Sequence, residues 1–234
     1  MIFRKLLHVA DYPETVMRME THVDHMLTGF ASEEVWLLEH PNIYTLGTSA
    51  KDSDVLSPDL LPLYRTGRGG QVTYHGTGQR IAYVMIDLSQ RKQDLRWYVQ
   101  MLEEWLIITL KDLGIKGERR RERVGIWVSD EKGKEQKVAA IGVRVKKWIT
   151  FHGISLNVNP DLSYYQNIIP CGLSDYGVTS LHDRGVQANL HAVDDALEKN
   201  FRLLFDHGYS PTNSSPTQFA SVQSAWVHDH SEES

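Results

Sequence analysis

Cys171 is the residue of this chain whose chemistry is most restricted by its context. Because it is the sole cysteine among 234 residues, it can form neither an intramolecular disulfide nor a site built from several cysteines. Two interpretations remain open, a small buried apolar side chain or a nucleophile. The neighbouring Pro170 and Gly172 favour the nucleophile, because a rigid turn can present one side chain outward.

Lys137 is the candidate base or cation for that thiol. It begins a predicted apolar strand that runs to Gly142, and a lysine at such a place is ordinarily just exposed at the strand end. A free cysteine, with a pKa of about 8.5, is only a few per cent thiolate at neutral pH. A nearby ammonium would favour the thiolate, whereas a desolvated neutral lysine would accept the thiol proton.

The densest candidate binding loop is the glycine-rich segment from Arg68 to Gln79. Its glycines allow close approach of the backbone to a ligand and leave amide groups to bind a carbonyl or an anion. Its context does not fit the common nucleotide-binding loops, because a strand follows the glycines and no Gly-Lys-Ser/Thr ending is present. A tight hairpin explains Gly76 and Gly78 but not the polar and aromatic side chains beside them. These are Arg68, Thr73, Tyr74 and His75.

Other candidate sites are weaker. His22 and His25 share a helix face at i, i+3, but a polar helix surface explains the pair better than a metal, because no third ligand lies nearby. No Gly-x-Ser-x-Gly elbow indicates a Ser-His-Asp site. The basic run from Arg119 to Arg123 is interpreted as a solvated loop; the alternative is a patch that, with Lys146 and Lys147, binds a partner.

The composition predicts an ordinary globular protein with a full core, since 41% of residues are hydrophobic and 24% charged. The net charge of −5 argues against nucleic-acid binding, which requires a basic excess. No apolar stretch approaches the roughly 20 residues that span a bilayer, and the first residues do not resemble a signal peptide. We therefore expect a cytoplasmic protein that contacts no membrane.

The apolar periodicity predicts one α+β domain, a mixed β-sheet with packed helices, over residues 1–208. Residues 209–234, rich in Ser, Pro, Thr, Gln and His, are expected to form a loosely ordered tail. Helices are predicted at 12–29, 95–113 and 191–206, and strands at 34–39, 72–74, 81–86, 124–128, 138–145 and 148–157. Residues 48–66 are predicted to form a loop, and Lys146-Lys147 the turn of a hairpin. The last helix is expected to bury Ala192, Ala196, Leu197 and Leu204.

Several blocks of the chain together resemble the octanoyl-[acyl-carrier-protein]:protein octanoyltransferases of lipoate synthesis. The similarity covers about residues 35–185, in the order found in that family. It runs through Glu39–Gly47, Arg68–Gln79, Lys137–Gly142, Phe151–Asn159, Pro170–Gly172 and Val178–Leu181. Thr77 stands where the family usually has proline, which loosens the turn but removes no functional group.

The resemblance implies the fold of the biotin and lipoate protein ligases and assigns roles to individual residues. Cys171 would be the acyl-thioester nucleophile, and Lys137 would tune or deprotonate it. The acyl pocket would be lined by Arg68, Gly69, Gly70, Gln71, Val72, Thr73, Tyr74 and His75, by Ala140, Ile141 and Gly142, and by Gly153, Ile154 and Ser155. No metal and no cofactor are implied, because the donor is already a thioester and needs no ATP.

The implied reaction takes an octanoyl group from octanoyl-acyl carrier protein to a lysine ε-amine through a thioester on Cys171. The implied acceptors are lipoyl domains of the 2-oxoacid dehydrogenase complexes and the glycine cleavage H protein. Two other functions remain open. One is a ligase that adenylates lipoate or biotin with ATP and does not need Cys171; the other is a non-catalytic carrier-binding module in which Cys171 is merely packed.

Overall fold

A computed structural model describes residues 1–121, 123–169 and 176–206 as one α+β domain. The helices are α1 (Tyr12–Leu27), α2 (Leu95–Asp112) and α3 (Leu190–Phe205). The strands are β1 (Ile2–Val9), β2 (Glu34–Glu39), β3 (Ile43–Leu46), β4 (Leu63–Arg65), β5 (Val72–His75), β6 (Gln79–Met85), β7 (Glu118–Arg120), β8 (Arg123–Ser129), β9 (Glu135–Lys146), β10 (Ile149–Asn157) and β11 (Gly177–Val178).

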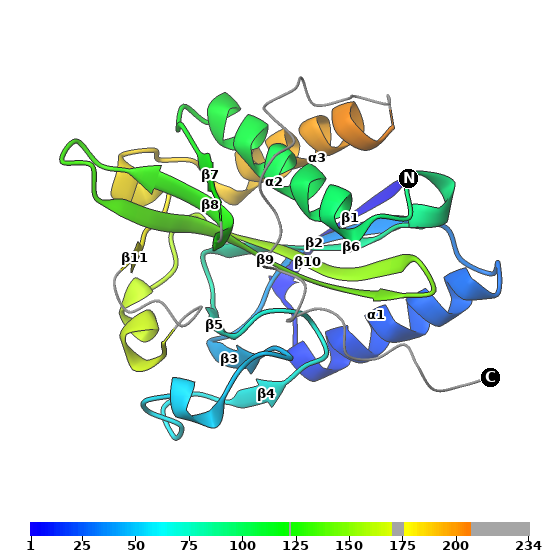
Figure 1. The fold of residues 1–234 in the computed structure, drawn as a ribbon, viewed down its shortest axis with the longest axis horizontal. Coiled ribbons are helices and arrows are strands. Elements are labelled where there is room, and N and C mark those ends of the chain that lie inside the picture. Colours follow the sequence, from blue (N-terminus) through cyan, green and yellow to red (C-terminus); the bar gives the residue numbers. More distant parts are fainter. Residues whose placement is uncertain (122, 170–175, 207–234) are drawn as a thin grey trace.

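The larger of the two sheets is mixed and has the order β1-β2-β6-β10-β9-β8-β7, with the short β11 beside β9. β1 pairs with β2 in parallel and β11 with β9 in parallel, while the remaining neighbours are antiparallel. Strands β4, β3 and β5 form a second sheet. Figure 1 shows α2 and α3 on one face of the large sheet, with α1 and the small sheet on the other.

The predicted helices are confirmed, and each begins at a residue that suits a helix N-terminus. The side chains of Asp11, Asp94 and Asn189 accept hydrogen bonds from backbone N–H groups three residues further on. These bonds satisfy donors that have no partner within the helix. Ala192 is the exception to the predicted inner positions of α3: it is exposed, while Leu197 and Leu204 are buried.

Strand β10 is the centre of the large sheet, and all nine of its residues are buried. It pairs with β6 on one side and with β9 on the other. The turn between β9 and β10 comprises Lys147 and Trp148, whose φ angles of 48° and 69° are those of a tight two-residue hairpin. The hairpin is therefore confirmed, with its turn one residue later than predicted.

The structure corrects the sequence prediction in the first half of the chain. Strands β1 and β3 were not expected: β1 is an edge strand whose residues are mostly exposed, and β3 has only four residues. The predicted loop over 48–66 contains a short 3₁₀ helix, η1 (Asp52–Asp54), and β4. The strands β5 and β6 do not form a hairpin, because each belongs to a different sheet.

The basic run from Arg119 to Arg123 is not a solvated loop. Arg119 and Arg120 belong to β7 and Arg123 to β8, and all three side chains are partly buried. The predicted tail over 209–234 lies outside the described residues, and among those that are described no helix is long and apolar enough to cross a membrane.

A buried ion pair connects the sheet to α3. Arg80 of β6 places Nε 2.8 Å from Oδ1 of Asp194, and both side chains are less than a tenth exposed. Burial raises the pKa of the Asp194 carboxyl, and the Arg80 charge opposes that rise. Removing one partner would leave an unpaired charge in the interior.

We predict that Arg80→Met lowers the free energy of unfolding by about 3–5 kcal/mol, because it leaves the Asp194 carboxylate buried without its cation. Replacing both residues, with Arg80→Met and Asp194→Leu together, should recover most of that loss. Urea unfolding of the three proteins measures both effects. A double variant as unstable as the single one would show that packing, not the charge, connects β6 to α3.

Candidate functional site

Lys137 lies in a small recess between the two sheets. It is the third residue of β9 and is only partly exposed. It therefore lies within the strand, whereas the sequence pattern placed it at the start. The recess is lined by Thr73 of β5, Lys137, Ala139 and Ala140 of β9, Ser155 and Asn157 of β10, Tyr165 and Val178. Three separate predicted blocks, which include Thr73, Ala140 and Ser155, therefore meet at one place.

The predicted nucleophile, Cys171, lies in the segment 170–175, outside the described residues. The chain is described on both sides of that segment. Before it, Tyr165 of the 3₁₀ helix η3 (Leu162–Asn167) lines the Lys137 recess. After it, Val178 of β11 pairs with Lys137 and lines the same recess. The two described flanks of the Cys171 segment thus converge on Lys137.

The glycine-rich loop is organised around the buried side chain of Arg68. Its guanidinium donates hydrogen bonds to the carbonyl oxygens of Thr45, Gly69 and Gln71, at 2.9, 2.9 and 3.0 Å. The Gly69 N–H in turn donates to Val143 O of β9 at 2.9 Å. A Cβ at Gly142 would lie 3.0 Å from Arg68 Cδ, so the glycine leaves room for the arginine.

Other predicted pocket residues differ in which face of their sheet the side chain occupies. The backbones of Ala140, Ile141 and Gly142 pair in register with those of Ser155, Ile154 and Gly153, so these two blocks lie side by side. The side chains of Val72 and Tyr74, in contrast, pack on the far side of β5, and Ile154 packs beneath α2 and α3. Any contact of these three with a ligand would come from their backbone.

A chain of hydrogen bonds that the sequence reasoning did not identify connects β5 to β11. Gln79 Oε1 lies 2.7 Å from His75 Nδ1, and Gln79 Nε2 donates to Asn157 Oδ1 at 2.9 Å. Asn157 Nδ2 donates to Thr179 O at 3.0 Å, and Thr179 N donates to Lys137 O at 3.0 Å. The available sequence signal was a polar residue at the end of each of two apolar strands, Gln79 in β6 and Asn157 in β10.

Three buried histidines lie beside this network. His40 Nδ1 is 2.8 Å from Ala10 O, which can only accept, so Nδ1 carries the proton and Nε2 accepts from the Tyr83 hydroxyl at 2.8 Å. Burial lowers the pKa of His40 to about 4 and the pKa values of His75 and His152 to about 3. The three imidazoles are therefore neutral at physiological pH. They do not form a metal site, since no group of three or more suitable ligands occurs among the residues described.

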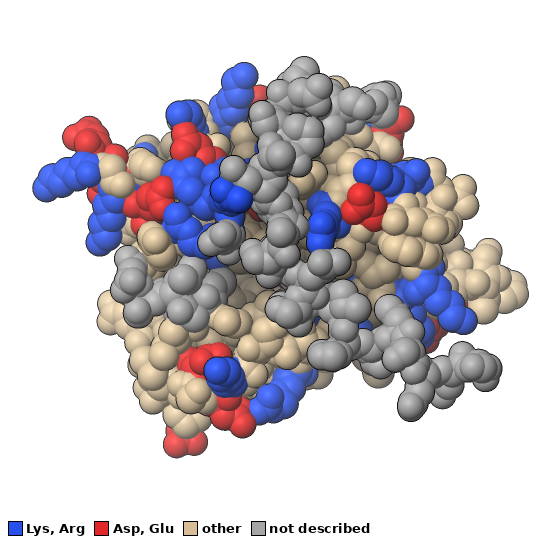
Figure 2. Space-filling view, viewed as in Figure 1, with Lys and Arg blue, Asp and Glu red and all other residues tan. Residues whose placement is uncertain are grey.

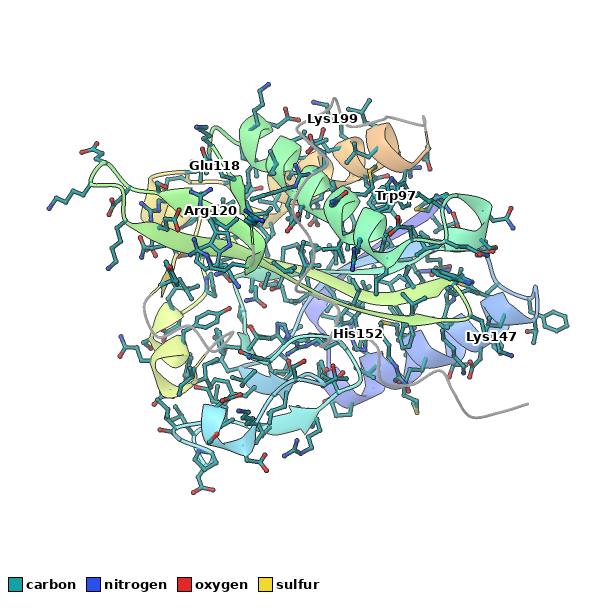
Figure 3. The ribbon with its side chains drawn as sticks, viewed as in Figure 1. Trp97, Glu118, Arg120, Lys147, His152 and Lys199 are labelled. Atoms are coloured by element: carbon teal, nitrogen blue, oxygen red, sulfur yellow. The ribbon has the colours of Figure 1, made fainter. Side chains whose placement is uncertain are left out.

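His152 adopts an unusual conformation within β10. Its φ is 57°, in the left-handed region that residues other than glycine seldom occupy. Its ring stacks on that of Phe151 and meets Tyr83 edge to face at 5.7 Å, which places it on the α1 side of the sheet (Figure 3). Its Nε2 is buried and makes no hydrogen bond to any residue that the structure describes.

The two basic segments do not form one surface. Arg120, on β7, and Lys147, at the β9–β10 turn, lie at opposite ends of the molecule (Figure 3). Acidic side chains lie among the arginines of β7 and β8 (Figure 2): Arg119 pairs with Glu103 and Glu104, and Arg120 and Arg123 share Glu135. Much of the positive charge of the run is therefore neutralised within the protein.

Comparison with known proteins identifies the class to which this fold and site belong. Residues 11–202 match the family model of the lipoyl protein ligase A/B catalytic domain. The fold is that of solved lipoate protein ligases. A bi-partite ligase from an archaeal lipoylation system of Thermoplasma acidophilum superposes with a TM-score of 0.66 at 17% identity, over 87% of this chain and 83% of that one. A lipoate-protein ligase A bound with ATP gives 0.64 at 18% identity, over 87% and 85%.

The chain belongs to the lipoyl protein ligase A/B catalytic domain family. Curated relatives that align with most of this chain carry the name octanoyltransferase. The protein from Bartonella quintana is 50% identical over 206 residues, which are 85% of this chain and 84% of the relative. The protein from Parvibaculum lavamentivorans is 56% identical over 200 residues, 84% of this chain and 89% of the relative.

The buried histidines predict a pH-dependent stability. A histidine with a depressed folded-state pKa stabilises the fold above its unfolded pKa of about 6.5, and that contribution is lost as the pH falls towards the folded value. With three such groups, the free energy of unfolding should fall by up to about 5 kcal/mol between pH 6.5 and pH 5.

The variant His152→Asn tests this assignment, because asparagine tolerates a positive φ and does not titrate. It should reduce the pH-dependent loss by about one third, measured by urea unfolding at pH 5, 6 and 7. The exposed His8 provides the control, since His8→Asn should leave the loss unchanged. An equal pH dependence in wild type and His152→Asn would contradict the assignment.

Proposed function

We propose that this protein is an acyltransferase that moves an octanoyl group from octanoyl-acyl carrier protein to a lysine ε-amine of lipoyl domains. The observation that carries the proposal is the 50–56% identity to proteins named octanoyltransferase, over most of both chains. The recess around Lys137 supports it, because both described flanks of the Cys171 segment reach that recess. The proposed acceptors include the 2-oxoacid dehydrogenase complexes and the glycine cleavage H protein; a structural relative comes from a lipoylation system that includes an E2 lipoyl domain.

The proposed reaction has two transfers. In the first, the Cys171 thiolate attacks the carbonyl carbon of the octanoyl thioester; the bond to the carrier sulfur breaks, and the released carrier thiolate takes a proton. In the second, the acceptor lysine amine attacks the carbonyl of the enzyme thioester and loses a proton. The bond to Cys171 Sγ breaks as the amide forms. Each step breaks one bond to the acyl carbonyl carbon and forms another, so the reaction needs neither ATP nor an oxidant.

Lys137 is the proposed proton carrier in both transfers. Its side chain reaches the recess from β9, and its backbone is held on both sides, by Trp127 of β8 and by Val178 of β11. A lysine fixed in this way can accept the thiol proton before the first attack and an amine proton during the second. A fixed ammonium would instead act only as a charge that favours the thiolate.

The acyl chain is proposed to lie against the joined β9 and β10 backbones, from Ala140 to Gly142 and from Gly153 to Ser155. Burial of about six methylenes at ~0.8 kcal/mol each contributes ~5 kcal/mol, enough to favour a medium-length chain. The glycine-rich loop closes one side. Its Gly69 amide already donates to Val143 O, so a developing oxyanion would have to be bound by other backbone amides of the loop.

The proposed function makes two predictions, of which the first concerns the acyl-enzyme. After the protein is mixed with octanoyl-acyl carrier protein, intact-mass spectrometry should show one octanoyl group on Cys171, removed by hydroxylamine. Cys171→Ser should lose most turnover, because an alkoxide is much harder to form than a thiolate at neutral pH.

Two controls identify the competing functions. ATP-dependent pyrophosphate exchange with octanoate or lipoate, retained in Cys171→Ser, would indicate an adenylating ligase of the same family. Full transferase activity after complete alkylation of Cys171 would contradict the thioester mechanism, because the chain offers no second cysteine.

The second prediction separates the two roles of Lys137. Arginine keeps the charge but cannot release a proton at working pH. If proton transfer is required, Lys137→Arg should alkylate readily with iodoacetamide yet turn over as slowly as Lys137→Ala, with a loss of about 10²–10⁴ in kcat. Lys134→Ala, an exposed lysine three residues away, is the matched control and should have wild-type activity.

We expect proton transfer to be the larger effect, because the acceptor amine must lose a proton before the amide forms. Iodoacetamide rates against pH, together with kcat, decide between the roles. Appreciable turnover in Lys137→Arg would assign Lys137 as a fixed charge. Unchanged thiol titration and turnover in Lys137→Ala would remove Lys137 from the mechanism.

A further inference from the structure

Trp127 of β8 lies directly against the proposed catalytic lysine. The two residues are cross-strand partners, so their side chains share one face of the sheet. Lys137 Nζ lies 4.8 Å from the centroid of the Trp127 ring, within the range of a cation–π interaction. The indole itself is almost fully buried, at 2% exposed.

This contact depends on a β-bulge between β8 and β9. Ile126 pairs with Ala139, but the next residue, Trp127, pairs with Lys137 and not with Val138. In a regular antiparallel register, Trp127 would face Val138, whose side chain is buried in the core beneath α2 and α3. The bulge therefore aligns the indole with the lysine, which is a common use of bulges next to functional sites.

A glycine beside the bulge leaves room for the stem of the lysine. Gly125 has a φ of 116°, a backbone conformation that side chains strongly disfavour. A Cβ at this position would lie 3.4 Å from Lys137 Cε and 2.7 Å from Ala139 O. The lysine side chain thus passes over the bare backbone of Gly125 to the indole of Trp127.

Arg123 and Tyr176 also contact the indole. The Arg123 guanidinium carbon lies 4.5 Å from the Trp127 ring centroid and 3.9 Å from that of Tyr176. Trp127 Nε1 donates to Arg123 O at 3.1 Å, and Arg123 Nη2 donates to Glu135 Oε2 at 2.6 Å. Tyr176 meets Trp127 edge to face at 5.5 Å. Because Tyr176 is the first described residue after the Cys171 segment, the same stack also fixes the point at which the chain returns to the sheet.

We infer that Trp127 is a positioning residue for Lys137: its ring face holds the lysine Nζ at the recess, and Arg123 with Tyr176 fixes the ring. The inference rests on the proposed function, in which Lys137 transfers protons to and from Cys171. Trp127 takes part in that transfer only by positioning Lys137. A tryptophan that merely filled the core would affect stability but not the titration that controls turnover.

The test compares Trp127→Phe, which keeps a weaker ring face, with Trp127→Leu, which keeps only apolar volume. Trp127→Leu should lower kcat roughly 3- to 30-fold, with a smaller loss in Trp127→Phe and little change in KM for the octanoyl donor. The pH dependence of kcat should shift in Trp127→Leu. The control is Trp97→Leu, a partly buried tryptophan of α2 at a distance from the recess, which should leave kcat and its pH profile unchanged.

A double-mutant cycle separates this inference from the proposed function. If Trp127 acts through Lys137, Trp127→Leu should cause no further loss of kcat in the Lys137→Ala background. Additive losses, or an unshifted pH profile, would overturn the positioning role while leaving the thioester mechanism intact. Failure of the proposed function would appear differently, as a wild-type enzyme that forms no acyl-enzyme.

A measurement that does not depend on turnover distinguishes loss of lysine positioning from loss of stability. In lysine-labelled protein, the ε-methylene protons of Lys137 should be shifted upfield by the indole ring, and Lys137→Arg assigns the signal by its loss. The shift should disappear in Trp127→Leu while the remaining spectrum shows a folded protein. An unchanged Lys137 signal in that variant would overturn the inference.

Discussion

Complete burial of β10 is the constraint on which the rest of this structure depends. A strand covered on both faces must satisfy every polar group inside the protein, because no water is available to do so. β10 meets most of this requirement through its two antiparallel neighbours and through side-chain bonds such as that between Asn157 and Gln79; the buried Nε2 of His152, which has no hydrogen-bond partner among the described residues, is an exception. The same bonds continue to Thr179 and thus hold the chain after the Cys171 segment beside Lys137.

The electrostatic character of the site follows from that burial. The buried histidines are kept neutral by desolvation, so positive charge in this part of the protein comes from lysine and arginine side chains of the glycine-rich loop, β8 and β9. Arg68 and Arg123 are each held by partners within the protein, the first by backbone carbonyls and the second by Glu135 and two aromatic rings. Lys137 lines the wall of the recess, with its Nζ against the ring of Trp127.

Much of the architecture was predictable from the sequence, because long apolar patterns with capped ends determine helices and buried strands. The three helices, β2 and the β9–β10 hairpin follow from such patterns. Strand β1 was missed because an exposed edge strand has no clean alternation, and β3 because four residues carry too little pattern. The assignment of β5 and β6 to different sheets depends on long-range packing, which local turn residues do not encode.

Several residues that the sequence singled out meet in the structure, but the contacts that connect them were not predictable. Lys137, Thr73, Ala140 and Ser155 could be singled out, and the structure brings them to one recess. The hydrogen bonds that link His75 to Lys137 through Gln79 and Asn157, and the approach of Trp127 to Lys137, depend on strand register and on a bulge. A one-residue shift in register has no signature in residue types, since Trp127 beside Val138 would have satisfied the same apolar pattern.

The bulge between β8 and β9 also bears on the order in which the site assembles. Gly125, Trp127 and Lys137 lie within thirteen residues of one another in the sequence, so the lysine and its aromatic support belong to one local hairpin. The pairing of Val178 with Lys137 spans 41 residues, and closing so long a loop costs more chain entropy. Contacts between near neighbours in sequence form faster than distant ones. The β8–β9 side of the recess can therefore be in place before β11 pairs with it, so that the chain returns at β11 to a hairpin that has already formed.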